Sequence, residues 1–178
     1  MKIKMETLAE FYSVSNDSFT VGRCIQANDN YFLLETLDSQ GKWNGYYWFS
    51  KSMVDSIEYN TAYLKKVSIY EECWKQDNYM KPKLSRECFK AFDATSILEM
   101  AIEKKMVITV FTKEDREFNV GFLRKEGKKY KLNCISLEDA NSLGDFSFKA
   151  DEVVFIEIDS PDNNLLGYAY ERTNGKKR

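Results

Sequence analysis

The chain has 178 residues, of which 43% are apolar and 15% are aromatic. That is enough apolar material for one large packed core or two small ones, so a disordered chain is excluded as the first interpretation. Lysine and arginine number 26 against 28 acidic residues, which excludes a general electrostatic attraction for nucleic acid but leaves room for a local basic patch.

The chain contains no histidine, and its four cysteines form no Cys-x-x-Cys pair. A Ser-His-Asp triad, a Cys-His pair and a histidine metal site are therefore excluded, and a zinc ribbon is not indicated. We expect no enzymatic activity, no cofactor and no metal site. The sequence has no run of eighteen apolar residues and no signal-peptide pattern. We therefore expect a cytoplasmic protein with reduced thiols and no membrane partner.

The first predicted element is a strand, LAEFYSV, which begins at Leu8. A second strand begins at Phe19 and contains Gly22, and a turn at residues 27–30 leads to a third strand, YFLLETL, with alternating side chains. An aromatic strand, GYYWF, a short turn at residues 50–53 and a last strand, VDSIEY, follow. Because glycine inside a strand favours a sharp bend, we expect these five strands to close on themselves as a small barrel.

A connector follows, in which the apolar pattern is irregular and a short helical turn is expected at residues 85–89. The segment DATSILEMAIEKK then predicts a helix that is capped by Asp93 or Thr95 and ends at two lysines. We expect its apolar stripe to pack on the strands that follow rather than to form a groove for a partner. The stripe consists of Ile97, Leu98, Ala101 and Ile102.

The strand VITVFT then starts a second copy of the first pattern, at a constant offset of 99 residues. Residues 19–58 and 118–157 align without a gap, and ten of forty positions are identical, where chance predicts roughly two or three. Strands, turns and glycines stay in step, which indicates an internal duplication. The identical pairs are Phe19/Phe118, Val21/Val120, Gly22/Gly121, Tyr31/Tyr130, Leu33/Leu132, Gly45/Gly144, Phe49/Phe148, Val54/Val153, Ile57/Ile156 and Glu58/Glu157.

The order of these elements resembles the Sm-like (LSm) family, whose members are small barrels that associate with RNA. In the second copy, VITVFTKEDREFNVGFLRKEGKKYKLNCI is similar to the first motif of the family, and FSFKADEVVFIEI is similar to its second motif. Both copies have the V-x-x-I spacing of that second motif. The resemblance covers residues 8–59 and 94–158.

The fold prediction is a mainly β (α+β) protein with two tandem five-stranded Sm-like or SH3-like barrels and a partly helical connector. The predicted parts are a first barrel at residues 1–66, a connector at 67–93, a helix with the second barrel at 94–168, and a basic C-terminal tail at 169–178.

The resemblance implies a nucleic-acid site at the start of the third strand of each copy. Members of the family that bind RNA stack a base on an aromatic residue there, and nearby lysines would contact phosphates. The asparagine of the family is replaced by leucine in both copies, and its Arg-Gly pair is missing, which removes groups that read a uracil edge and a phosphate. The predicted nucleic-acid-binding residues are Tyr31, Lys51, Lys128, Lys129, Tyr130 and Lys149.

Two non-catalytic functions stay open. The first is binding of RNA or another single-stranded nucleic acid, which the paired tyrosines and the lysine-rich turn at residues 125–131 favour. The second is a protein-interaction or assembly module, which the acidic balance and the missing RNA-reading groups favour. In that case the edge strands would contact another protein or a further copy of the chain, as edge strands do in the rings of the family.

Overall fold

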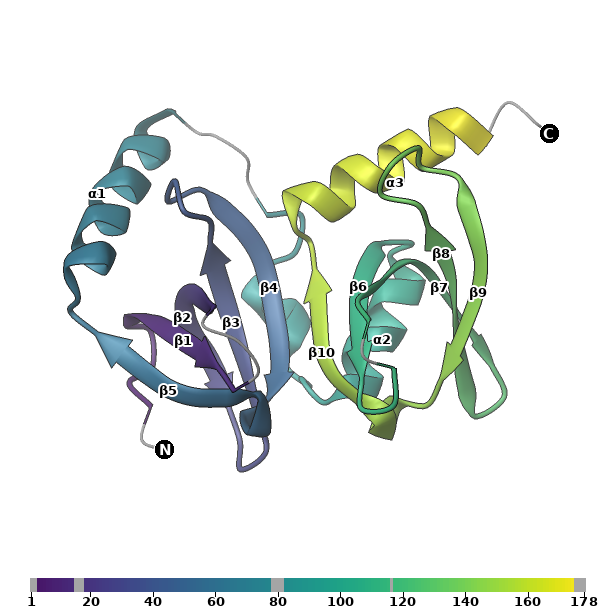
Figure 1. Ribbon diagram of the computed structural model, residues 1–178, viewed down its shortest axis with the longest axis horizontal. Coiled ribbons are helices and arrows are strands. Elements are labelled where there is room, and N and C mark those ends of the chain that lie inside the picture. Colours follow the sequence, from purple (N-terminus) through teal and green to yellow (C-terminus); the bar gives the residue numbers. More distant parts are fainter. Residues whose placement is uncertain (1–2, 15–17, 78–81, 116, 175–178) are drawn as a thin grey trace. The chain divides into compact units, whose positions relative to one another are not determined.

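The structure is a computed structural model of the whole chain (Figure 1). The chain divides into two compact units, Met1–Lys83 and Leu84–Arg178, called unit 1 and unit 2 below. Both units are built mainly from β-strands, so the predicted mainly β fold class is confirmed. The residues that the structure describes are 3–14, 18–77, 82–115 and 117–174.

Unit 1 contains five strands that pair in the order β5-β1-β2-β3-β4, and each pairing is antiparallel. A short 3-10 helix joins β4 to β5, and an α-helix follows β5. The strands agree with those predicted from side-chain alternation. Their bounds are β1 Leu8–Ser13, β2 Phe19–Ala27, β3 Tyr31–Leu37, β4 Trp43–Ser50, η1 Lys51–Met53, β5 Val54–Tyr59 and α1 Ala62–Asp77.

Unit 2 has the same plan, with two additional helical segments before its first strand. Its strands pair in the order β10-β6-β7-β8-β9, again antiparallel throughout. The elements are η2 Arg86–Phe89, α2 Ala94–Glu103, β6 Val107–Thr112, β7 Asn119–Glu126, β8 Lys129–Ile135, β9 Ser142–Phe148, η3 Ala150–Glu152, β10 Val153–Ile158 and α3 Pro161–Asn174.

Backbone pairing leaves the sheet of each unit open, which corrects the prediction of closed barrels. In unit 1, β5 and β4 are the two ends of the strand order, and no ladder joins them among the described residues. The same holds for β10 and β9 in unit 2. The reason lies in the turn before the last strand, because the three residues of η1 lead β5 away from β4 and into a pairing with β1.

The backbone conformation repeats at the same offset of 99 residues as the sequence. Both helices that follow the sheets are capped alike, since Thr61 Oγ1 accepts the Leu64 amide at 3.1 Å and Ser160 Oγ accepts the Asn163 amide at 3.2 Å. A positive φ is uncommon outside glycine, so agreement at several positions indicates a true duplication. The matching positive-φ pairs are Glu6/Lys105, Gly41/Ala140, Gly45/Gly144 and Asn60/Asp159.

Helices α1 and α3 are part of the repeat, although the sequence did not predict them. The expected end of the first barrel at residue 66 falls inside α1, and the expected start of the tail at residue 169 falls inside α3. Residues 175–178 of that tail lie outside the described part of the chain. Among the side chains of α1 that the structure describes, only Leu64 and Val67 are buried in the core of unit 1, so the helix lacks a strong apolar stripe.

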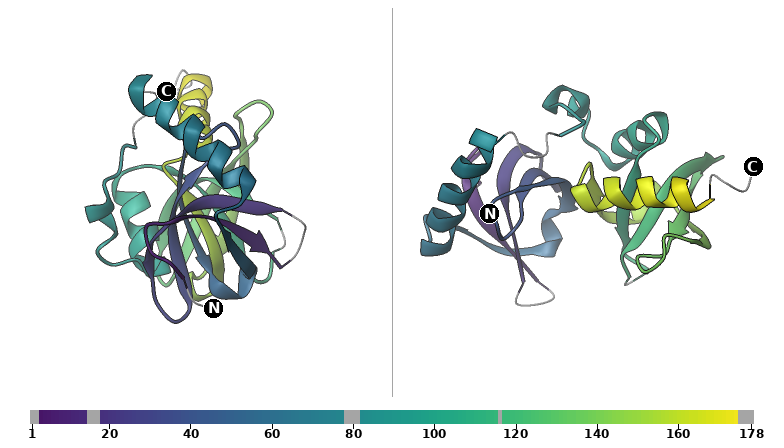
Figure 2. Two further views of the ribbon diagram at one scale, coloured as in Figure 1. Left: turned by 90° about the vertical axis from the view of Figure 1, so that its left-hand side faces the viewer. Right: turned by 90° about the horizontal axis from the view of Figure 1, so that it is seen from above.

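The helical segments before β6 confirm their predictions. Segment η2 lies where a short helical turn was expected, and α2 begins after Asp93. The Asp93 carboxylate accepts the Ser96 hydroxyl at 2.6 Å, which is the main cause of its lowered pKa, and the Ser96 amide at 3.1 Å, which caps the helix. Residues Ile97, Leu98 and Ala101 of α2 are buried as predicted. Helix α2 contacts β7 and β10, whereas α3 contacts β6 and β7 (Figure 2).

The core of unit 1 is strongly aromatic. Phe11, Phe32 and Phe49 come from three different strands, and their ring centroids lie 5.8–6.1 Å apart. Edge-to-face contacts of this kind stabilise a core beyond the area they bury. At the two strand glycines, Gly22 and Gly121, the backbone of the neighbouring strand comes too close to leave room for a side chain.

Candidate functional site

The predicted stacking residues, Tyr31 and Tyr130, do not present open rings. The ring of Tyr31 lies on Trp48, with centroids 4.4 Å apart and planes at 24°. Tyr130 is 3% exposed and stacks on Phe148 with centroids 6.0 Å apart. Burial raises the pKa of the Tyr130 hydroxyl, as expected for a group withdrawn from water. A base has no access to Tyr130 in this structure and can reach at most one face of Tyr31.

The predicted lysines at the last turn of each sheet lie beside these tyrosines. Tyr31 pairs with the residue before Lys51, and Tyr130 pairs with the residue before Lys149. Lys51 Nζ is 5.0 Å from the centroid of a buried ring, that of Phe32. Lys149 Nζ is 3.8 Å from a carboxylate oxygen of the nearby Glu152. Both ammonium groups therefore have partners within their own unit.

The remaining predicted lysines, Lys128 and Lys129, lie in the β7–β8 hairpin. Both are exposed, and neither has an ion pair among the described residues. The basic side chains on the strands beside them are paired with carboxylates, so the lysine-rich segment is largely neutralised. These pairs are Arg124 with Asp145 and Glu126, Lys125 with Glu99, and Lys131 with Glu126.

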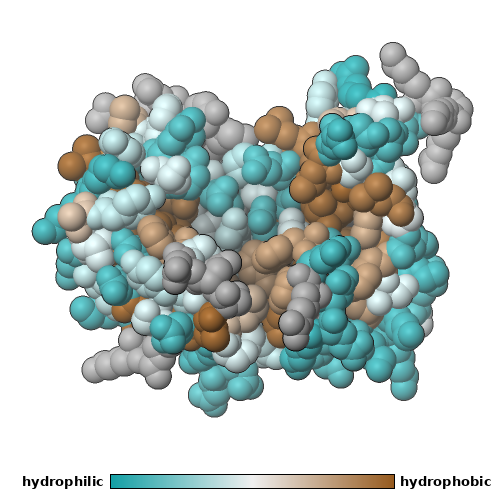
Figure 3. Space-filling model, viewed as in Figure 1, coloured by the Kyte–Doolittle hydropathy of each residue, from teal (hydrophilic) through white to brown (hydrophobic). Residues whose placement is uncertain are grey.

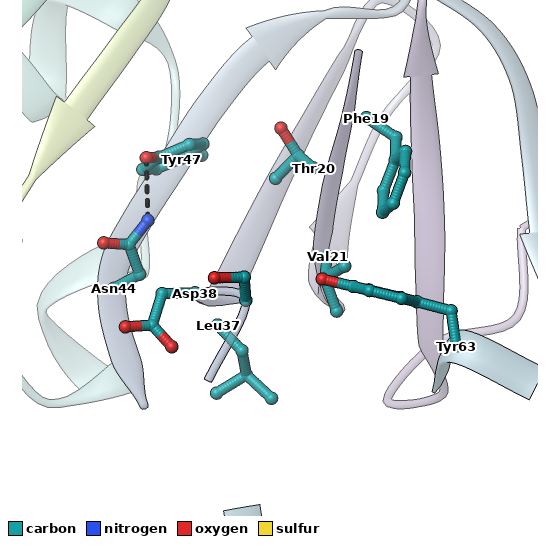
Figure 4. Close-up of a pocket in the computed structure, with 9 residues that line it drawn as sticks. Phe19, Thr20, Val21, Leu37, Asp38, Asn44, Tyr47 and Tyr63 are labelled. Atoms are coloured by element: carbon teal, nitrogen blue, oxygen red, sulfur yellow. Dashed lines mark hydrogen bonds between the residues drawn. The ribbon is translucent and has the colours of Figure 1, made fainter. Parts of the chain in front are cut away.

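A cavity of about 260 Å³ lies in unit 1, between the sheet and the first turn of α1 (Figure 4). Rings and polar groups meet around it. Phe19 and Tyr63 lie on one side and make an edge-to-face contact, with centroids 5.3 Å apart. Tyr47 and Asn44 lie on the other side, and the Asn44 amide donates to the Tyr47 hydroxyl at 3.0 Å. The remaining lining residues are Thr20, Val21, Leu37, Asp38 and Ser39.

Unit 2 exposes several large apolar side chains. Leu137 is 80% exposed in the β8–β9 loop, and Leu143 is 71% exposed on β9. On α3, Leu165 is 61% and Tyr168 is 58% exposed. Figure 3 shows apolar surface on α3 and on the β8–β9 segment beneath it. Leu137 and Leu143, one in the β8–β9 loop and one at the start of β9, are called the apolar patch below.

The offset of 99 residues relates the cavity of unit 1 directly to the apolar patch of unit 2. Asp38 corresponds to Leu137, and Asn44 corresponds to Leu143. The local backbone is alike at both places, because Gly45 and Gly144 have φ values of 96° and 101°. Two positions that hold polar residues in unit 1 therefore hold two of the most exposed leucines in unit 2.

These residues were not among the predicted site residues. Their signal is present in the ungapped alignment of the two copies, where the loops SQGKWN and EDANSL exchange polar for apolar residues. Recognising a cavity additionally requires Tyr63, and this residue lies in a helix that the sequence did not predict. In the strand KYKLNCI, Tyr130 alternates with lysines and shares a face with Leu132, and the structure buries both side chains.

The described part of the chain shows no group of three or more Cys, Asp or Glu side chains placed to hold a metal ion. None of the helices described is long and apolar enough to cross a membrane. All four cysteines are unpaired.

Comparison of the chain with models of protein families, with curated proteins and with solved structures gave no match.

Proposed function

We propose that the chain is a non-catalytic protein-interaction module and that the apolar patch of unit 2 is its contact surface. The observation that carries the proposal is the exposure of Leu137 and Leu143, at positions where unit 1 has Asp38 and Asn44. Side chains as exposed as these contribute nothing to the core of their own unit. Exposed apolar patches of this kind mark surfaces that a partner covers.

We propose a partner segment in extended conformation that adds to strand β9. This strand is the last in the order of the unit 2 sheet, and its first four residues, from Ser142 to Asp145, are exposed. It contains neither lysine nor proline, the residues that often protect an edge strand from pairing. Leu143 lies on this strand and Leu137 lies beside it, so apolar side chains of an added strand would meet both.

The test is a variant that carries the residues of unit 1 in unit 2, Leu137→Asp with Leu143→Asn. Peptides are first selected for binding to the wild-type chain from a random display library. We expect the selected peptides to have apolar residues at alternate positions, and their affinity to fall about a hundredfold in the double variant, because burial of each leucine contributes about 1.5 kcal/mol. The backbone already accommodates these residues in unit 1, so we expect the variant to remain folded.

The control is Val14→Asn, which makes an apolar side chain of unit 1 polar where it is 61% exposed. Peptide affinity should not change in this variant. Failure to select any peptide, or peptides that bind the double variant as tightly as the wild type, would contradict the proposal.

Binding of single-stranded nucleic acid is the second candidate, and the exposed pair Lys128 and Lys129 supports it. Phosphate contacts make such binding sensitive to salt. Fluorescence anisotropy with a labelled single-stranded RNA, at low and moderate salt, should then show weaker binding and a smaller salt dependence for Lys128→Ala with Lys129→Ala. If the RNA does not bind, or if the double variant binds unchanged, this candidate is wrong.

Membership of the Sm-like family is likewise a proposal. The order of elements supports it, since each unit has a strand, a glycine-bearing second strand, two further strands, a short 3-10 turn and a fifth strand that pairs with the first. In unit 2 a helix precedes these elements, as in the resemblance. The open backbone pairing means that the proposal concerns strand order and not barrel closure.

A further inference from the structure

The cavity of unit 1 has no role in the proposed contact surface, and the chemistry of its walls indicates a ligand of its own. Among the nine residues that line it, Asp38 carries the only formal charge. We propose that the cavity binds an ammonium or guanidinium group, which Asp38 holds by an ion pair and the surrounding rings hold by cation–π attraction.

The carboxylate of Asp38 is fixed in place by its own loop. Its Oδ1 accepts the amides of Gln40 at 2.8 Å and Lys42 at 2.9 Å. Within the part of the chain that the structure describes, Oδ2 has no hydrogen-bond donor. A carboxylate oxygen accepts more than one hydrogen bond, so this atom is left to receive N–H donors of a cation. A carboxylate that is already oriented loses little freedom on binding.

Aromatic faces of the cavity complement that charge. Phe19 is 38% exposed although it contacts Tyr63, so part of its ring is open to a ligand. Tyr47 presents its ring from β4, on the side where Asp38 lies (Figure 4). The volume of about 260 Å³ is smaller than that of most drug-sized sites and suits a small group such as an alkylammonium head.

Contacts of Tyr63 show which ring surfaces are already used. Lys66 Nζ lies 4.5 Å from the centroid of the Tyr63 ring, so this ring is in contact with an ammonium group of the chain itself. Lys66 is exposed and does not line the cavity. A ligand is therefore expected to use Phe19, Tyr47 and Asp38, while Tyr63 closes the side of the cavity next to α1.

Unit 2 provides an internal comparison, because it keeps the ring of Phe19 as Phe118 but lacks the charge and the other groups around it. The offset of 99 residues replaces Asp38 by Leu137, Asn44 by Leu143, Tyr47 by Phe146 and Tyr63 by Asp162. The proposed cation site therefore belongs to unit 1 alone, and binding should leave the corresponding amides of unit 2 unaffected.

The test is a titration followed by the backbone amide signals in 1H–15N NMR spectra of the full chain. The two probes are methylammonium chloride and Nα-acetyl-lysine amide, which represent a free cation and a lysine side chain of a protein. We expect signals of residues 19–21, 37–39 and 44–47 to shift with at least one probe. Comparable affinities would indicate a small free cation, whereas tighter binding of the blocked lysine would indicate a protein side chain.

The decisive variant is Asp38→Asn, which keeps the Oδ1 acceptor of the loop and removes the charge. We expect about a fivefold to tenfold loss of affinity. Asp55→Asn removes an exposed carboxylate of the same unit and should leave affinity unchanged. The proposal is overturned if neither probe shifts these signals at tens of millimolar, or if Asp38→Asn binds as the wild type does. Variants of the apolar patch should bind both probes normally, so this result is independent of the proposed protein contact.

Discussion

Replacement of Gly121 by alanine is expected to destabilise the chain by about 3 kcal/mol, among the largest effects of a single added methyl group. Gly121 on β7 pairs with Cys134 on β8. A Cβ at this position would overlap the carbonyl oxygen of Asn133 and lie 2.7 Å from its carbonyl carbon. These are backbone atoms in a hydrogen-bonded strand, so relief requires the two strands to separate. Urea denaturation of the variant and the wild type measures the difference.

Two other glycines provide the comparison. Gly22→Ala, the equivalent change in unit 1, should also destabilise strongly, since its Cβ would lie 2.5 Å from the Glu35 carbonyl oxygen. In Gly127→Ala the added methyl group meets no atom within 4 Å. The cost comes only from the φ of 61°, which disfavours a residue with a side chain, so we expect a destabilisation of about 1 kcal/mol. Equal effects at Gly121 and Gly127 would show that close strand packing is not the reason for the strand glycines.

The second large effect concerns the attachment of α1 to the sheet of unit 1. Arg23 donates two hydrogen bonds to Glu71, at 3.0 and 2.6 Å, and both side chains are mostly buried. The offset of 99 residues places Phe122 and Tyr170 at the equivalent positions in unit 2, and their ring centroids lie 5.5 Å apart. One contact between sheet and helix is thus ionic in one unit and aromatic in the other.

A double-mutant cycle should show strong coupling. We expect Arg23→Phe and Glu71→Tyr each to cost about 2 kcal/mol, because each leaves the other charge mostly buried with its main partner removed. The double variant reproduces the pair of unit 2 and should return to within about 1 kcal/mol of the wild type. Urea denaturation of all four proteins measures the coupling, and additive single effects would contradict it.

The same pair makes stability depend on pH. Burial alone would raise the pKa of Glu71, but the hydrogen bond and charge of Arg23, together with Lys75, outweigh it and lower the pKa below the usual 4.5. A lowered pKa in the folded state means that the stabilisation is complete above pH 4.5 and is lost as the pH falls through the folded-state value. The variant that carries both Arg23→Phe and Glu71→Tyr should lose this part of the pH dependence of stability.

Much of the fold was predictable because the signals were local. The alternation of YFLLETL, the glycine-bearing second strands and the cap at Asp93 each depend on a few neighbouring residues, and the structure has these elements where they were expected. Helices α1 and α3 escaped prediction because each buries few side chains. The caps at Thr61 and Ser160 were a usable signal that extends the repeat past its identical positions.

The candidate sites were less predictable because they depend on which side of a strand faces water. Tyr130 follows a turn rich in lysine, as a stacking residue would, yet it lies on the same face of β8 as the buried Leu132 and is itself in the core. The cavity of unit 1 combines residues from three strands, a loop and a helix, and no short stretch of sequence contains them. Asp38 and Leu137 differ clearly in the alignment of the two copies. The effect of that difference can be judged only when the backbone around the two residues is known to be alike.

The strand order of each unit also has a consequence for folding during synthesis. In unit 1, β1 pairs with β2, β2 with β3 and β3 with β4, so these four strands can form as successive hairpins. Strand β5 must return to β1, at the far end of the sheet. Until the ribosome releases β5, the backbone groups on the outer edge of β1 have no partner strand, and a nascent chain stalled at that stage would present an open edge to other unfinished chains.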